Sequence, residues 1–186
     1  MNLTDTQHEG LALPMHMIGN MMVPDERIHK ALHNSGLVDD LLDYEINLLA
    51  GLITVQYFEA KEFVTELNDH FLKESLMILV EGQIQVTATV NNEPVLLDLE
   101  TPGDVARIIS FVGGSMMNVS AKMKIRKDSV VLLLPRAKLE SMLHTYPSIV
   151  YGVMRNLVRH VHGVVRRKNA ESAQLSNYFF RMNGRY

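Results

Sequence analysis

Residues 103–127 hold the side chains of this chain that are best suited to binding an anion. They contain a single carboxylate, Asp104, against five cations: Arg107, Lys122, Lys124, Arg126 and Lys127. Guanidinium and ammonium groups donate charge-assisted hydrogen bonds to phosphate and carboxylate oxygens. Gly113-Gly114 could add backbone N–H donors, which in a turn form an anion-binding concavity. The segment therefore indicates a small-anion site with Arg107 as its anchor.

Strand alternation gives a second interpretation of the same cations. Lys122, Lys124 and Arg126 are two residues apart and share one face of a strand, whereas Met123 and Ile125 share the other face. If the apolar face is buried, the three cations belong to the solvated exterior of the protein. We favour this second interpretation.

No other pattern in the sequence favours catalysis or metal binding. The chain has no glycine-rich P-loop, nucleophile elbow or zinc motif. The absence of cysteine excludes disulfides and thiolate ligands. His29 and His33 share a helical face but lack a third ligand, and His160 and His162 point to different faces of one helix. We therefore expect no catalytic residue, no metal and no cofactor.

Short runs of β-branched and apolar residues predict strands across residues 53–134. The runs cover 53–58, 62–65, 75–80, 83–90, 95–99, 119–125 and 130–134, with turns at 68–69, 81–82, 91–94 and 101–103. Many short strands at even spacing are typical of a sandwich or a barrel. Residues 83–90 alternate as a strand with one buried face does.

Helical patterns flank the predicted strands on both sides. Residues 25–53 begin with the acidic pair Asp25-Glu26, are interrupted at Gly36, and then carry an apolar stripe. Prolines open a short helix over 137–144 and a longer helix that runs to about Lys168. Five apolar residues of the longer helix step by four and three and predict a dimer interface: Val150, Met154, Leu157, Val161 and Val164. Further apolar residues widen this stripe, so one edge can pack on the strands and another on a partner helix.

The two ends of the chain differ from the middle. Residues 1–24 predict an irregular, Met-rich arm, and residues 169–186 form a basic, aromatic tail. We expect this tail to pack its aromatic rings on protein, although it could also stack on bases or lie on a membrane surface. No apolar run is long enough to span a membrane, and the N-terminus lacks the features of a secretory signal. We therefore expect a cytoplasmic location.

Charge divides the chain into two unequal halves. Residues 1–100 hold 17 acidic and 4 basic side chains, a balance of −13, and residues 101–186 hold 4 acidic and 14 basic side chains, a balance of +10. Such polarity can indicate an acidic partner such as nucleic acid or a membrane surface. We favour neutralisation within the fold or across a dimer, because opposite charges also support association.

The order of these elements and several motifs resemble the cyclic nucleotide-binding domain, the sensor module of the catabolite activator protein family. Residues 76–86 resemble the family's Ile-Leu-x-Gly-x-Val strand pair, residues 57–64 its aromatic–basic turn, and residues 127–134 its last strand. The resemblance covers residues 28–168. It implies an α+β, mainly β, fold over 25–168. In this fold a jelly-roll β-barrel at about 53–134 is flanked by N-terminal helices and by C-terminal helices at 137–168.

The nucleotide-binding cassette departs from that family. Where the family has roughly Gly-Asp-Phe-Gly-Glu-Leu, residues 103–108 read Gly-Asp-Val-Ala-Arg-Ile. The resemblance implies that Arg107 replaces the glutamate that accepts from the ribose, and that Val119 replaces the arginine that pairs with the phosphate. Each lost charged partner costs on the order of 2–5 kcal/mol, which together weaken a complex by about three or more orders of magnitude. We therefore expect no ordinary binding of cyclic AMP or cyclic GMP. The remnant cassette comprises Gly103, Asp104, Ala106, Arg107, Ile108, Val119, Ser120 and Lys122.

Three hypotheses for function follow. The first is a regulatory or protein-interaction module that forms a homodimer through the long helix and binds an unknown protein partner. The second is a sensor of a cyclic nucleotide or another small anion through a remodelled, basic cassette. The third is a relative of transcription regulators that acts by heterodimerisation. The family's regulators carry a helix-turn-helix domain after the long helix, whereas 18 residues follow Lys168 here, so we do not expect DNA binding.

Overall fold

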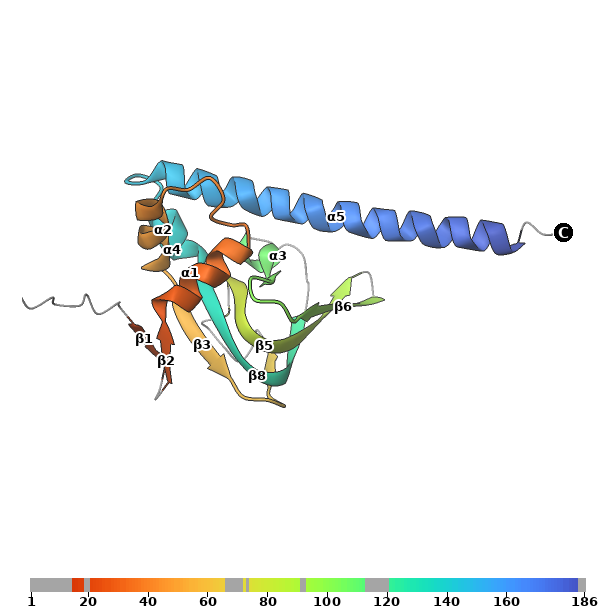
Figure 1. Cartoon of the computed structure of the whole chain (residues 1–186), viewed down its shortest axis with the longest axis horizontal. Coiled ribbons are helices and arrows are strands. Elements are labelled where there is room, and N and C mark those ends of the chain that lie inside the picture. Colours follow the sequence, from red (N-terminus) through yellow and green to blue (C-terminus); the bar gives the residue numbers. More distant parts are fainter. Residues whose placement is uncertain are drawn as a thin grey trace, which may run out of the picture.

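A mainly antiparallel β-sheet packs against helices, and the longest helix runs along one side of the sheet and continues beyond it (Figure 1). The structure is a computed structural model and describes residues 15–18, 21–65, 72, 74–90, 93–112 and 121–183. Two long strands, β5 and β8, form the centre of the sheet and curve strongly (Figure 1). This arrangement confirms the predicted mainly β fold with flanking helices.

The six-stranded sheet has the order β3-β8-β5-β6, with β4 paired to β8 and β7 paired to β5. All of these pairings are antiparallel. The strands are β3 (Thr54–Phe58), β4 (Phe63–Thr65), β5 (Ser75–Val90), β6 (Glu93–Leu99), β7 (Val105–Ala106) and β8 (Ala121–Pro135). The sequence did not predict β7, which has only two residues.

The predicted turn at residues 81–82 is wrong, because β5 runs through it as one strand with a β-bulge. Gly82 has a φ of +107°, and a Cβ there would lie 2.5 Å from the carbonyl oxygen of Asp128. Only glycine fits both the backbone conformation and this close approach. In the same way, the described residues 121–125 of one predicted strand and the predicted strand at 130–134 belong to the single strand β8, while residues 119–120 lie outside the described residues.

The bulge also changes which side chains face each side of the sheet. Before it, Ile78 and Val80 belong to a buried cluster between the sheet and the helices. After it, Ile84 and Val86 belong to a second cluster enclosed by the curved sheet. One extra residue reverses the alternation, so even-numbered side chains pass from one cluster to the other.

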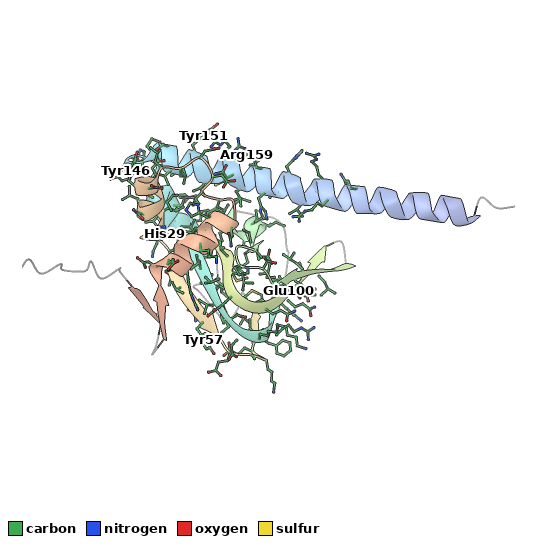
Figure 2. The ribbon with its side chains drawn as sticks, viewed as in Figure 1. His29, Tyr57, Glu100, Tyr146, Tyr151 and Arg159 are labelled. Atoms are coloured by element: carbon green, nitrogen blue, oxygen red, sulfur yellow. The ribbon has the colours of Figure 1, made fainter. Side chains whose placement is uncertain are left out.

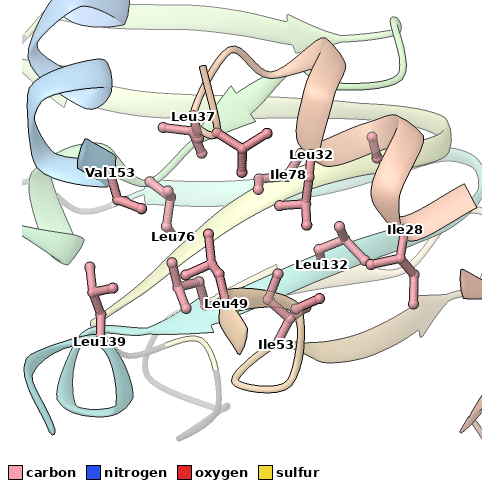
Figure 3. Close-up of a cluster of buried hydrophobic side chains, with 14 of the residues drawn as sticks. Ile28, Leu32, Leu37, Leu49, Ile53, Leu76, Ile78, Leu132, Leu139 and Val153 are labelled. Carbon is pink, nitrogen blue, oxygen red and sulfur yellow. The ribbon is translucent and has the colours of Figure 1, made fainter. Parts of the chain in front are cut away.

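We name these two buried clusters by their place in the fold. The helix-side cluster includes Ile28, Leu32, Leu49, Leu76, Ile78, Leu132 and Val153 (Figure 3). The sheet-side cluster includes Phe58, Leu72, Met77, Leu79, Ile84, Leu99, Ala106, Ile125 and Leu133. Alternate residues of β5 and β8 supply both clusters, so the same two strands support both cores.

The helices before the sheet agree with the sequence, and the last helix is longer than predicted. The helices are α1 (Asp25–Asn34), α2 (Asp43–Ala50), α3 (Ile108–Phe111), α4 (Arg136–Ser141) and α5 (Pro147–Asn183). The predicted end of α5 near Lys168 is wrong. No proline or glycine occurs between Gly163 and Asn183, so nothing in that stretch breaks the helix.

Part of the predicted irregular arm is regular. Met15–Ile18 (β1) and Met21–Pro24 (β2) form an antiparallel pair in which Met17 lies opposite Met22. The sequence places Gly19-Asn20 between them, a two-residue combination that is common in hairpin connections. Residues 1–14 and 184–186 lie outside the described residues.

None of the helices in the described part of the chain is long and apolar enough to cross a membrane.

Candidate functional site

Residues 103–108, the cassette, are fastened to both the sheet and helix α1. The amide of Gly103 donates to the carbonyl of Leu79 at 2.8 Å, and Ala106 pairs with Met77 across β7 and β5. Gly103 has a φ of +100°, and a Cβ there would lie 2.5 Å from the Cβ of Asn34. The glycine is therefore required for the close contact between the cassette and the end of α1.

The carboxylate of Asp104 is used within its own turn. Its Oδ2 accepts hydrogen bonds from the amides of Glu100 at 2.9 Å and Thr101 at 2.8 Å. The amide of Asp104 in turn donates to the carbonyl of Thr101 at 2.9 Å. These hydrogen bonds stabilise the turn before β7, so the role of the Asp104 carboxylate is to hold this turn.

Arg107 is buried at the end of the cassette and contacts the chain's own backbone. It adopts a left-handed conformation, with a φ of 67°, immediately before α3, and its side chain is only 9% exposed. The guanidinium group donates to the carbonyl oxygen of Leu72, a fully buried member of the sheet-side cluster. The family that the sequence resembles has a glutamate at this position that accepts a hydrogen bond from the ribose. Here the position holds an arginine that is hydrogen-bonded inside its own domain.

The other predicted cassette residues fall in three different environments. Ala106 lies in the sheet-side cluster, and Ile108 packs against the helix-side cluster. Lys122 is exposed on β8, opposite Thr65 and Thr87, so the structure does not bring it together with the buried residues of the cassette. Val119 and Ser120 lie outside the described residues.

The alternation predicted for the basic strand is confirmed. Met123 and Ile125 are buried, whereas Lys122 and Arg126 are exposed. Lys124 lies over the ring of Phe63, with its Nζ 5.5 Å from the ring centroid. Arg126 donates to the Oε1 of Gln85 at 2.7 Å. These cations therefore belong to the outer face of the sheet and do not line the cassette.

Helix α5 buries part of the predicted dimer interface inside its own domain. Val150 and Leu157 belong to the helix-side cluster, and Leu157 is only 2% exposed. Met154 packs against the same cluster, and Val164 is half-buried. Only Val161, at 40% exposed, is open to solvent, so the predicted pairing of these five residues with a partner stays a prediction.

A polar cluster that the sequence did not reveal fixes α5 to the loop between α1 and α2. The buried amide of Asn156 donates to the carbonyl oxygens of Leu37 at 3.1 Å and Asp39 at 2.6 Å. Arg155 and Arg159 both pair with Asp40 at 3.0 Å. Figure 2 shows Arg159 further along α5 than Tyr151. These partners are more than 100 residues apart, and no local pattern indicates them.

The histidines do not form a metal site in the described part of the chain, where no group of three or more His, Asp or Glu side chains could hold a metal ion. His160 on α5 is partly buried, and this burial together with the nearby Arg167 lowers its pKa. Asp104 acts in the opposite direction.

The match to a known family falls on the sheet just described. Residues 55–146 match the sequence model of the cyclic nucleotide-binding domain. The class defined by this fold is therefore the cyclic nucleotide-binding domain, and this segment of the chain belongs to that family. No curated protein matches the chain in sequence.

Solved structures show the same fold. A cyclic nucleotide-binding domain from Methylobacillus flagellatus KT is 16% identical with a TM-score of 0.63, covering 79% of this chain and 83% of that one. The catabolite activator protein of Thermus thermophilus is 19% identical with a TM-score of 0.56, covering 76% of this chain and 63% of that one. The regulatory subunit of a cAMP-independent protein kinase A from Trypanosoma brucei is 19% identical with a TM-score of 0.51, covering 72% and 47%. This chain thus spans less than two thirds of the Thermus protein, and these identities establish the fold alone.

Proposed function

We propose that the chain is a non-enzymatic regulatory or protein-interaction module that does not bind cyclic AMP or cyclic GMP in the ordinary way. The observation that carries this proposal is the buried contact of Arg107. Its guanidinium donates to the carbonyl of Leu72, where the resemblance called for a carboxylate that accepts from the ribose. Ala106 beside it contributes a methyl group to the sheet-side cluster. The Trypanosoma brucei subunit, which belongs to a cAMP-independent protein kinase A, offers a parallel for such use of the fold.

We also infer that α5 pairs two copies of the chain. The support is a set of exposed apolar side chains, namely Tyr151, Val158, Val161 and Val165, with Val158 66% exposed. They step by seven, three and four residues. In the same heptad register the sequence next has the polar residues Lys168 and Ser172, and then the apolar residues Leu175, Phe179 and Met182. Of the five residues predicted from the sequence to form the dimer interface, only Val161 belongs to this exposed set. Met154, which is partly buried, lies at its edge. Of the other three predicted residues, Val150 and Leu157 belong to the helix-side cluster and Val164 is half-buried.

A cytoplasmic setting fits this proposal. A cysteine-free chain needs no oxidising compartment for disulfides. The proposed pairing also needs no partner beyond a second copy, although an unidentified protein partner stays part of the proposal.

Thermal unfolding with cyclic AMP and cyclic GMP tests the loss of ordinary nucleotide binding. A ligand at about 100 times its dissociation constant stabilises a protein by about 2.7 kcal/mol. We expect no shift for the unaltered chain and a measurable shift after combining Ala106→Gly, Arg107→Glu and Val119→Arg. Arg126→Glu, which makes the same substitution as Arg107→Glu but on the outer face of the sheet, is the control. A shift of the unaltered chain with either nucleotide would contradict the proposal.

Light scattering tests the pairing through α5. Combining Val158→Glu with Val161→Glu should give a monomer, because two charges on each helix repel across the seam. Val112→Glu alters an exposed valine outside α5 and should leave the dimer intact. If the doubly substituted chain stays dimeric, α5 is not the interface.

A further inference from the structure

Helix α5 carries a basic groove on the side away from its exposed valines. Six residues line this hollow of about 570 Å³: Arg159, His160, Gly163, Arg166, Arg167 and Ala170. Arg159 and Arg166 flank one side, and His160 and Arg167 flank the other, each pair seven residues apart. At about 100° per residue, Val158, Val161 and Val165 lie roughly 140–160° around the helix from Gly163. We call the hollow the α5 groove.

The charge of the α5 groove is not balanced within the helix. Residues 147–170 contain no aspartate or glutamate. Arg159 shares the carboxylate of Asp40 with Arg155. Within the described part of the chain, Arg166 and Arg167 form no ion pair, and both are exposed. Two neighbouring guanidinium groups are therefore available to an external anion.

The floor of the α5 groove is open to solvent. A Cβ on Gly163 would meet no atom within 4 Å, so the space above the helix backbone is open there. Ala170, one heptad later, keeps the floor low at its other end. All six lining residues come from α5, so the hollow is shallow and open to solvent along its length.

We propose that the α5 groove binds a small ligand that carries two or more phosphate groups. Guanidinium groups form bidentate hydrogen bonds with phosphate oxygens, and Arg166 and Arg167 present one such group on each side of the α5 groove. The site is separate from Arg107, whose guanidinium contacts Leu72. It therefore goes beyond the proposed function and does not depend on it. A nucleic acid or a membrane would bind protruding cations without needing the open floor at Gly163.

Isothermal titration of the full chain with inorganic tripolyphosphate at about 0.15 M salt tests this proposal. We expect saturable binding with one ligand per chain. Combining Arg166→Gln with Arg167→Gln should weaken binding by about tenfold or more, because hydrogen bonds to charged groups are lost. Arg126→Gln removes an exposed arginine from strand β8, outside the α5 groove, and should leave binding unchanged.

Gly163→Leu supplies an independent test, because it fills the floor without removing charge. Leucine favours helix more than glycine does, so the variant keeps the helix. We expect it to weaken binding by about tenfold or more, as the loss of the two arginines does. Unchanged binding in Gly163→Leu, or equal weakening in Arg126→Gln, would show a diffuse basic surface and overturn the proposal. Binding of a DNA duplex with no binding of tripolyphosphate would also overturn it.

The pKa of His160 provides a local measure of ligand binding in the α5 groove. Burial and the nearby Arg167 lower its pKa, and Asp104 acts in the opposite direction. A phosphate bound beside Arg167 should raise the pKa of His160, as followed by nuclear magnetic resonance titration with and without tripolyphosphate. An unchanged pKa under saturating tripolyphosphate would place the bound ligand elsewhere and overturn the proposal.

Discussion

The first three turns of α5 and the remainder of the same helix follow one apolar pattern but have different environments. Up to Leu157, the aliphatic side chains pack into the helix-side cluster while Tyr151 stays exposed, and Asn156 fixes the helix to the loop after α1. Beyond it, valines are exposed on one side and arginines on the other. The helix then continues past the sheet (Figure 1).

The difference shows that a heptad pattern predicts an apolar stripe without saying what covers it. Val150 and Leu157 are covered by the domain, whereas Val158 and Val165 are open to a second molecule. The stripe rotates slowly around a straight helix, so one continuous run of apolar residues can serve both contacts. The following substitutions test whether the two parts of α5 differ as described.

Leu157→Glu should give the largest effect. It places a carboxylate in the helix-side cluster and removes a fully packed side chain, which should cost roughly 4 kcal/mol or more of unfolding free energy. Val161→Glu, on the exposed part, should change it by less than about 0.5 kcal/mol. Urea denaturation checks both, with the proteins compared as monomers at high dilution. Equal losses of unfolding free energy in the two variants would contradict the difference between the packed and the exposed part of α5.

Asn156→Ala should cost about 2 kcal/mol. It leaves the carbonyl groups of Leu37 and Asp39 without their side-chain donor in a buried setting. Asn169→Ala changes an exposed asparagine on the projecting part and should cause no loss. Denaturant unfolding of the two variants makes the comparison, and an Asn156→Ala protein as stable as the parent would contradict the anchoring role.

Acid should loosen the beginning of α5. Hydrogen bonds from the Leu42 amide and from Ser148 lower the pKa of Glu45, although burial opposes them. A lowered pKa means that the stabilisation is present above the unfolded pKa and is lost as pH falls through the folded pKa. We expect Glu45→Gln to lose about 1.5 kcal/mol at neutral pH and much less in acid. Stability curves from pH 7 to pH 3 check this, and parallel curves for the two proteins would contradict it.

Gly163→Ala should give the smallest effect, a gain of about 0.8 kcal/mol in local helix stability. Gly152→Ala should gain less, because its Cβ would lie 2.6 Å from the Cδ2 of Leu41, which must then move. Hydrogen exchange of the α5 amides measures both. A larger gain at Gly152 than at Gly163 would mean that the first turns of α5 are less tightly packed than described.

Much of the fold could be predicted because its signals are local. The acidic start of α1, the break at Gly36 and the alternation of Met123 and Ile125 each depend on neighbouring residues. The sequence predicted a turn at Gly82, whereas the structure has a bulge there. A glycine between two β-branched runs is compatible with either a turn or a bulge. Only the partner strand β8, which is far away in sequence, decides between them.

The candidate site was only partly predictable because its contacts are distant in sequence. The substitution at Arg107 is visible in the sequence, but its partner Leu72 is 35 residues away and carries no motif. Lys122 follows the cassette in sequence, yet its strand carries it to the outer face of the sheet. The α5 groove depends on side chains one heptad apart, a pattern that resembles ordinary helix surface until the hollow is known.

The continuity of α5 gives the molecule the geometry of a lever. Its 37 residues form one helix, and the anchoring contacts with the domain end near Leu157. The remaining 26 residues extend about 39 Å at 1.5 Å per residue. A tilt of about 10° at the anchored end therefore displaces the far end by about 7 Å. Any binding event that tilts α5 through the loop holding Asn156 would thus move the far end of the helix by several ångströms.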